Sequence, residues 1–166
     1  GLKYEIIPNG YRIEVKDTEE ATKLITTYPN LFKDYEVIVI DDGSTDDSAE
    51  IVNEYVKHNK NIRLIRQANQ GVVVARNNAI KQAQGTYIYP LDADDVISPS
   101  CLEKLCAAME ENKGDVIYSD VEYFGLKNGL FLKKEPNVWN MSVGNQIVVS
   151  ALYRKSDWEK YGGYDE

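Results

Sequence analysis

Residues 36–47 read EVIVIDDGSTDD, a run of β-branched residues that leads directly into an acidic turn. The run over residues 36–40 predicts a strand that is covered on both faces, because strands buried in parallel sheets are almost continuously apolar. Ser44 or Thr45 is expected to cap the helix that follows, whose acidic first turn suits the positive end of the helix dipole. A strand that passes at once into a helix is the repeating unit of an α/β sheet.

The same alternation of short apolar runs and amphipathic stretches continues along the chain. Further strands are expected at residues 62–65, 86–89, 116–118 and 147–153. Further helices are expected at about residues 17–28, 73–83 and 155–161, and at a segment that begins with Ser98-Pro99 and buries Leu102, Leu105, Cys106 and Met109. Strands and helices that alternate at this spacing predict a mostly parallel central sheet with helices on both faces.

The pattern changes beyond residue 118. Asn128-Gly129 lies between two apolar runs, an arrangement typical of a β-hairpin, so residues 122–124 and 130–132 are expected to pair. The strand expected at residues 147–153 would extend this part of the fold. The predicted fold class is therefore α/β with a small antiparallel addition.

The charge balance excludes several classes of function. The chain has 166 residues, with 19 Lys and Arg against 27 Asp and Glu and a net charge of −8. We expect no nucleic-acid partner, because binding one needs clustered cations that neutralise phosphates. The single histidine, His58, is expected on the surface at a helix end. Without a second histidine or an isolated nucleophile, a catalytic triad is not expected.

The cysteines and the apolar runs indicate in which cellular compartment the protein is expected. Cys101 and Cys106 have the spacing of neither a disulfide framework nor a zinc site, which favours a reducing cytosol. No apolar run approaches the roughly 18 residues of a membrane span. We therefore expect a cytoplasmic protein, with attachment to the inner face of the membrane through segments outside this chain as the alternative.

Two acidic clusters directly follow predicted strands: residues 41–47 and residues 92–95. Ligands of parallel sheets bind outside the carboxyl ends of the strands, so both clusters are expected to line one crevice. Concentrated carboxylates repel one another, and Mg²⁺ or Mn²⁺ with oxygen ligands would relieve that repulsion and bridge to a diphosphate. The alternatives are an acidic first helical turn for the first cluster and an acidic loop for the second.

A third group of residues surrounds a tight turn at Asn69-Gln70-Gly71 and the helix behind it, which carries Arg76. A planar guanidinium that is always charged suits a phosphate or the edge of a base. The alternative is an ordinary solvated helix charge.

Taken together, four segments resemble the family 2 glycosyltransferases. They are residues 35–46, residues 69–71 with Ala75-Arg76-Asn77, residues 91–95 and residues 162–166. They occur in the family's order and spacing from about Thr18 to the end of the chain. The resemblance implies the nucleotide-diphospho-sugar transferase fold, also called the glycosyltransferase A-type fold, with a nucleotide-diphosphate sugar donor, a divalent metal and inversion at the anomeric carbon.

The resemblance also implies roles for individual residues at the nucleotide. Asp42 would bond the base, with Asp41 beside it. Arg76 would lie against the nucleotide, and Asp92 would face the ribose.

At the diphosphate and the sugar, the resemblance implies that Asp94 holds Mn²⁺ or Mg²⁺ against both phosphates. The metal would stabilise the leaving diphosphate as a Lewis acid. Asp95 would lie near the sugar or the acceptor. The family's general base usually follows the segment that matches residues 162–166, so we expect it beyond Glu166 and regard the chain as truncated on that side.

The same resemblance implies a single glycosyltransferase domain over residues 1–166, with a nucleotide-binding half at 1–118 and an incomplete acceptor-side half at 119–166. The opening of the chain departs from the family pattern, and residues 4–7 and 11–15 compete to be the first strand.

We therefore expect metal-dependent sugar transfer from a nucleotide-diphosphate sugar, preferably a UDP-sugar, to a glycan or lipid-linked acceptor in polysaccharide or glycoconjugate synthesis. A donor-binding module without turnover is one alternative. Another is a haloacid-dehalogenase-like phosphatase with Asp92 as nucleophile, because residues 92–96 fit its Asp-x-Asp-x-Val loop. Pro90 and the single helix expected between this loop and the acidic residues near Asp120 argue against that alternative.

Overall fold

The computed structural model describes residues 4–7, 10–13, 35–111, 114–123, 128–131, 137–143 and 147–165. Two strands open the chain, β1 (Tyr4–Ile7) and β2 (Gly10–Ile13), and they pair antiparallel with Tyr4 opposite Ile13. The two segments that competed to be the first strand therefore both form strands. The helix predicted at residues 17–28 lies outside the described residues.

A parallel pair of strands carries the first acidic cluster. β3 (Val37–Asp41) and β4 (Ile62–Arg66) run parallel, with Val37 opposite Ile62, and α2 (Ser48–His58) connects them and contacts both. The strand, helix and strand were predicted. Residues 37–40 are half-buried rather than fully covered, and β3 has a pairing partner on one edge alone among the described strands.

The start of α2 corrects the prediction that Ser44 or Thr45 caps the helix. The helix begins at Ser48 with Asp47 at the cap position. The Ser44 N–H donates instead to Asp41 Oδ1 at 2.8 Å, and the Ser48 N–H donates to Asp46 Oδ1 at 3.1 Å. Side-chain bonds of this kind compete with helix formation, so the acidic cluster forms a loop before the helix.

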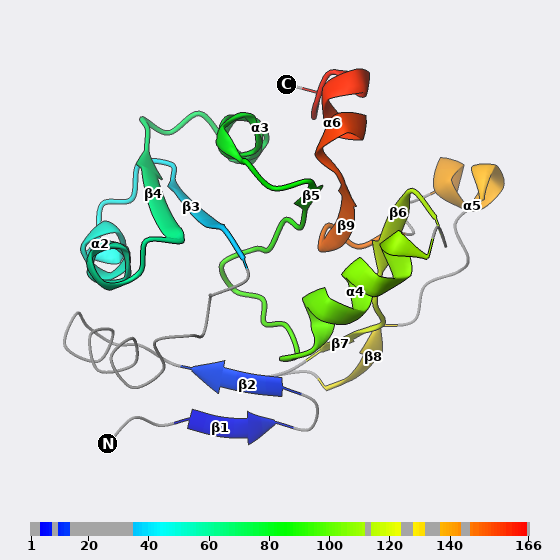
Figure 1. Ribbon diagram of the computed structural model, residues 1–166, viewed down its shortest axis with the longest axis horizontal. Helices are drawn as coiled ribbons and strands as arrows, with labels where there is room; N and C mark the ends of the chain where they lie inside the picture. Colours follow the sequence, from blue (N-terminus) through cyan, green and yellow to red (C-terminus); the bar gives the residue numbers. More distant parts are fainter. Residues whose placement is uncertain are drawn as a thin grey trace.

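A second sheet is antiparallel about its middle strand. β9 (Ala151–Arg154) lies between β5 (Tyr87–Ile88) and β6 (Val116–Tyr118) and runs opposite to both, so β5 and β6 share one direction (Figure 1). β9 is shorter than the predicted strand at residues 147–153. The Ala151 N–H donates to the Val149 carbonyl at 2.8 Å, and this tight turn excludes the preceding residues from the sheet.

The hairpin predicted around Asn128-Gly129 is present as β7 (Val121–Tyr123) and β8 (Gly129–Phe131). Tyr123 lies opposite Gly129, so the glycine belongs to the strand and the connection is longer than a two-residue turn. A short helix that the sequence did not predict follows, α5 (Val138–Val143).

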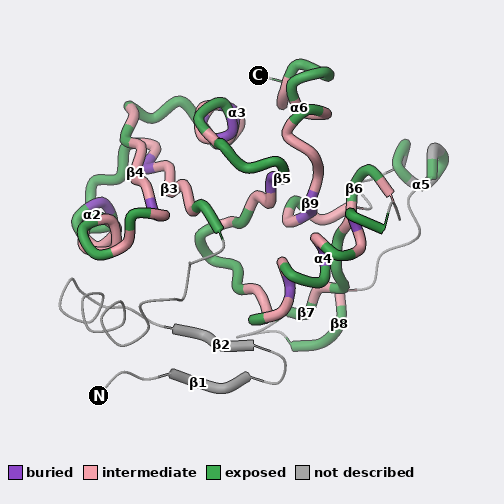
Figure 2. The backbone as a smooth tube through the Cα atoms, viewed as in Figure 1, coloured by how far each residue is buried: buried purple, intermediate pink, exposed green. Residues whose placement is uncertain are grey.

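The main core lies between α4 (Cys101–Glu110) and β9. Cys101, Leu105 and Met109 recur every four residues on one face of α4 and pack with Leu152. Figure 2 shows buried segments in both α4 and β9. The helix begins two residues after Pro99, later than predicted. Its first N–H, that of Cys101, donates to the Ser98 carbonyl at 3.0 Å, so the proline lies in a turn.

α3 (Val72–Gln82) lies between the β3–β4 pair and the β9–α6 segment (Figure 1). Its last carbonyls receive two cations. Arg63 Nη2 donates to the Gln82 oxygen and Lys155 Nζ donates to the Ala83 oxygen, each at 2.7 Å. Cationic donors suit the negative end of a helix, where carbonyls lack intrahelical partners.

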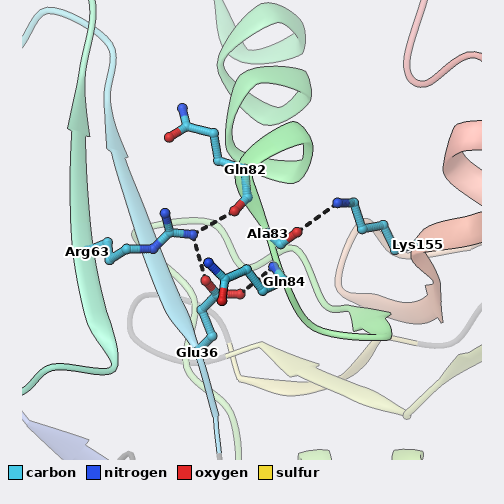
Figure 3. A network of polar contacts seen from close by, with 6 residues as sticks. All are labelled: Glu36, Arg63, Gln82, Ala83, Gln84 and Lys155. Carbon is cyan, nitrogen blue, oxygen red and sulfur yellow. Dashed lines mark hydrogen bonds and ion pairs between the residues drawn. The ribbon is translucent and has the colours of Figure 1, made fainter.

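Glu36 completes this network (Figure 3). Its carboxylate accepts from Arg63 Nη2 at 2.6 Å and from the Gln84 N–H at 2.8 Å. Lys155 is the first residue of α6 (Lys155–Tyr161), whose bounds match the prediction. The network thus joins β3, β4 and α6 to one end of α3. Among the helices in the described part of the chain, none has the length and apolar character needed to cross a bilayer.

The core predicts a clear difference between two leucines. Leu152 is 2% exposed in the centre of β9, whereas Leu130 on β8 is 64% exposed. Leu152→Ala should lower the free energy of unfolding by about 2–5 kcal/mol through lost burial and a cavity. Leu130→Ala, the matched control, should change it by less than about 0.5 kcal/mol. Urea unfolding of both variants measures this, and equal losses would contradict the assigned core.

The Glu36 network predicts a pH dependence of stability. Burial raises the pKa of Glu36, but hydrogen bonds from Gln84 and Arg63 and the Arg63 charge outweigh it, so the pKa lies below its ordinary value of 4.5. The stabilisation is therefore complete above the pKa of the unfolded chain and is lost as the pH falls through the lower folded value.

Glu36→Gln should accordingly be less stable than the wild type at pH 7, and the difference should shrink between about pH 5 and pH 3. Urea unfolding across this range measures it. A difference that stays constant over the range would show that the carboxylate charge contributes nothing.

Candidate functional site

The first acidic cluster begins with a buried carboxylate. Asp41 is the last residue of β3, and its side chain is 4% exposed. It accepts a hydrogen bond from Arg66 Nε at 2.9 Å, and Arg66 lies directly opposite on β4. Hydrogen bonds from the side chain and backbone of Ser44, with a further contribution from Arg66, outweigh burial and hold the pKa of Asp41 below its usual range. Asp41 is therefore a charged group that fastens the strand ends together.

Asp42 organises the loop that leads into α3. Its carboxylate accepts from the Gln70 N–H at 2.9 Å, the Gly71 N–H at 2.8 Å and Gln67 Nε2 at 2.7 Å. The Gln70 amide, followed by Gln67, lowers the pKa of Asp42 against the effect of burial. Gln67 also accepts from Asn78 Nδ2 at 2.8 Å, which connects the loop to the body of α3.

Glycine is required where the acidic turn meets this loop. Gly43 has a φ of +85°, and a Cβ atom there would lie 2.9 Å from the backbone nitrogen of Asn69. The turn after β3 and the turn before α3 are therefore in direct backbone contact. Two of the segments singled out in the sequence form one structure at the carboxyl end of the β3–β4 pair.

Arg76 joins this structure to the second acidic cluster. It projects from α3 and forms an ion pair with Asp92, which follows β5. The Arg76 side chain is 21% exposed, so it is not the solvated helix charge that was the alternative. Asp92, which the phosphatase alternative would use as a free nucleophile, is engaged by this guanidinium.

The second cluster is a tight turn of carboxylates. The Asp95 N–H donates to the Asp92 carbonyl at 3.1 Å. Burial, and then the charges of Asp94 and Asp92, raise the pKa of Asp95. Within the described part of the chain, the exposed Asp94 carboxylate forms no hydrogen bond or ion pair. The turn therefore presents one carboxylate held by a cation and two others that repel each other.

The donor atoms of this turn fit a hard divalent cation. Among the residues that the structure describes, no three or more side chains of His, Cys, Asp or Glu are grouped so as to enclose a metal. Mg²⁺ sites of enzymes that act on phosphates commonly use one or two carboxylates and complete their coordination with phosphates and water. A site of that open kind matches Asp94 and its neighbours.

Three residues that connect these parts had no role predicted from the sequence. Arg66 and Gln67 bind the two aspartates of the first cluster. Asn77, 4% exposed on α3, bonds the backbone of Tyr164. Asn77 and Tyr164 both lie in segments that carry the family resemblance. The signal in the sequence was an asparagine, a poor helix former, inside a predicted helix.

A groove of about 400 Å³ lies elsewhere, between β6, β9 and α6. Its lining includes Val116, Tyr153, Trp158 and Tyr161, and it contains no residue of either acidic cluster. The candidate site is therefore defined by its polar contacts and not by this groove.

Known proteins with similar sequences are glycosyltransferases. EpsJ of Bacillus subtilis is 43% identical over 84 residues, which cover 51% of this chain and 24% of EpsJ. The poly(ribitol-phosphate) beta-glucosyltransferase of Bacillus spizizenii is 37% identical over 143 residues, 82% of this chain and 22% of that protein. The matched segments thus cover about a quarter of the length of these relatives.

A solved structure with the same fold is that of S. aureus TarS 1-349 in complex with UDP. It superposes with a TM-score of 0.63 at 22% identity, and the match covers 92% of this chain and 48% of the TarS 1-349 chain. At this identity the likeness bears on the fold, and it confirms the glycosyltransferase A-type fold that the motif order implied.

The sequence model of glycosyl transferase family 2 matches residues 18–161. The matched range contains both acidic clusters, the loop held by Asp42 and the Arg76–Asp92 ion pair. The chain belongs to glycosyl transferase family 2.

Proposed function

We propose that the chain carries the donor site of an enzyme that transfers a sugar from a UDP-sugar to a glycan or lipid-linked acceptor, with inversion, in polysaccharide or glycoconjugate synthesis. The observation that carries the proposal is the Arg76–Asp92 ion pair. It brings the loop held by Asp42 and the acidic turn at residues 92–95 to the same edge of the fold. The solved TarS complex contains UDP, and one relative is named for glucosyl transfer to poly(ribitol-phosphate).

The nucleoside end of the donor belongs at the first cluster. The Asp42 carboxylate and the loop at residues 67–71 form a wall of hydrogen-bonding groups there, and Asp41 keeps this wall in place through Ser44 and Arg66. Arg76 and Asp92 offer a cation and an acceptor between the two clusters, which suits a ribose with its attached phosphates.

The diphosphate end belongs at the acidic turn. Asp94 would hold Mn²⁺ or Mg²⁺ there, with Asp95 toward the sugar or the acceptor. The cation supplies Lewis-acid stabilisation of the leaving diphosphate when it is bound. A chain with a net charge of −8 repels an anionic donor, so a cation between them has a binding role as well. An inverting transfer also needs a carboxylate near the acceptor hydroxyl, and none of the described residues is assigned to it.

Isothermal titration with UDP and Mn²⁺ tests the proposal. The intact chain should bind UDP, and chelation of Mn²⁺ should weaken the binding. Asp94→Ala should weaken it by at least about tenfold, since even indirect partners of metal ligands typically contribute that much. Asp120→Ala, which removes an exposed aspartate between β6 and β7, should bind like the wild type. No binding by the intact chain, or unchanged binding by Asp94→Ala, would overturn the donor site.

The loop that Asp42 holds can be tested with two glycines. Gly43 and Gly71 have φ values of +85° and +89°, so alanine strains the backbone at either. A Cβ on Gly43 would lie 2.9 Å from Asn69 N, whereas one on Gly71 would meet nothing within 4 Å. Gly43→Ala should therefore weaken UDP binding more than Gly71→Ala in the same titration. Equal effects would show that contact between the two turns does not shape the site.

A further inference from the structure

Asn77 makes an unusual contact for a residue in the middle of a helix. Its side chain is buried, with 4% of the residue exposed. Nδ2 donates to the Tyr164 carbonyl at 2.9 Å, and Oδ1 accepts from the Tyr164 N–H at 3.0 Å. One amide thus satisfies both backbone groups of a residue 87 positions away. Asparagine is a poor helix former, so its place in α3 follows from this contact.

The backbone around Tyr164 is shaped for the contact. α6 ends at Tyr161 with Gly162 at the cap position, and both Gly162 and Gly163 have positive φ values, +88° and +86°. A Cβ on Gly163 would lie 2.9 Å from Asn77 Oδ1. The two glycines turn the chain back from α6 onto α3, and only a residue without a side chain allows so close an approach.

A third contact fixes the same segment. The Tyr164 and Tyr153 hydroxyls lie 3.1 Å apart. Burial, together with the hydrogen bond to Tyr164, raises the pKa of the Tyr153 phenol, and the charge of Arg76 opposes this shift. Arg76 therefore acts electrostatically on the group that Tyr164 contacts.

α3 presents two neighbouring residues to different parts of the fold. Successive residues of a helix point in different directions. Arg76 binds Asp92 of the acidic turn, while Asn77 binds the segment of residues 162–165. A ligand that binds Arg76 therefore contacts the same helix that holds residues 162–165 through Asn77.

We propose that Asn77 is a positioning residue that couples occupancy of the nucleotide site at Arg76 to the order of residues 162–165. The inference rests on the donor site proposed above. Nucleotide binding stabilises the arrangement of α3 in which Asn77 holds Tyr164. By linkage, closure of the Asn77–Tyr164 contact strengthens nucleotide binding by the same factor.

Hydrogen exchange measured by mass spectrometry on residues 158–165 tests the coupling. In the wild type, UDP with Mn²⁺ should slow exchange of this segment. Asn77→Asp keeps the size of the side chain but sets a carboxylate oxygen against the Tyr164 carbonyl. It should speed exchange of the free protein by about tenfold, the effect of losing roughly one hydrogen bond, and abolish the response to UDP. Asn53→Asp, at an exposed position of α2, should leave both unchanged.

A second pair of variants keeps the test decisive if Asn77→Asp does not fold. Gly162→Ala and Gly163→Ala impose the same kind of backbone strain, but only the Cβ at Gly163 meets Asn77, since nothing lies within 4 Å of the one at Gly162. Gly163→Ala should lose the response of residues 158–165 to UDP, and Gly162→Ala should retain it.

The outcomes separate the two proposals. If titration shows that the wild type binds UDP while exchange of residues 158–165 does not change, the coupling is wrong and the donor site stands. The coupling is also wrong if Asn77→Asp and Gly163→Ala respond to UDP as the wild type does. If the titration shows that the wild type does not bind UDP, the donor site itself is wrong, and the coupling that rests on it is wrong as well.

Discussion

The architecture depends on how one end of α3 is held. The last carbonyls of this helix are bound by Arg63 from β4 and Lys155 from α6. Glu36, directly before β3, accepts from both Arg63 and the Gln84 N–H just past the helix. Among the described strands, neither β3 nor β4 pairs with a strand of the sheet around β9. α3 therefore connects the two sheets through these contacts. The positions of its residues at the site, such as Arg76, depend on how this end of the helix is held.

Charge distribution explains how an acidic chain maintains a crowded carboxylate site. Asp41, Asp42 and Asp92 each have dedicated donors, from Arg66, the amides of the loop before α3, and Arg76 respectively. Among the described residues, no donor is bound to the side chain of Asp94 or Asp95, and burial and the charges of Asp94 and Asp92 disfavour ionisation of Asp95. Asp41, Asp42 and Asp92 therefore hold the site in shape. Asp94 and Asp95 leave negative charge there that no cation of the described residues balances.

Much of the fold was predictable because its signals are local. Gly162 and Gly163 mark the end of α6, and the spacing of Leu105 and Met109 defines the inner face of α4. The start of α2 was predicted wrongly because Asp41 attracts the Ser44 amide, a competition that helix-capping preferences do not include. The acidic clusters were recognised from their places after strands, whereas the Asn77–Tyr164 contact joins residues 87 positions apart and no periodicity reports such a pairing. The roles that the family resemblance implies for individual aspartates remain predictions.

The loop that Asp42 holds has a further consequence for selectivity. Free N–H groups at the start of a helix are ordinarily a binding site for any small anion. Here the N–H groups of Gln70 and Gly71 are already bound by a carboxylate of the same chain. Inorganic phosphate in solution competes with a tethered group whose effective concentration lies in the millimolar range or above. Small anions in solution are therefore at a disadvantage at these two N–H groups.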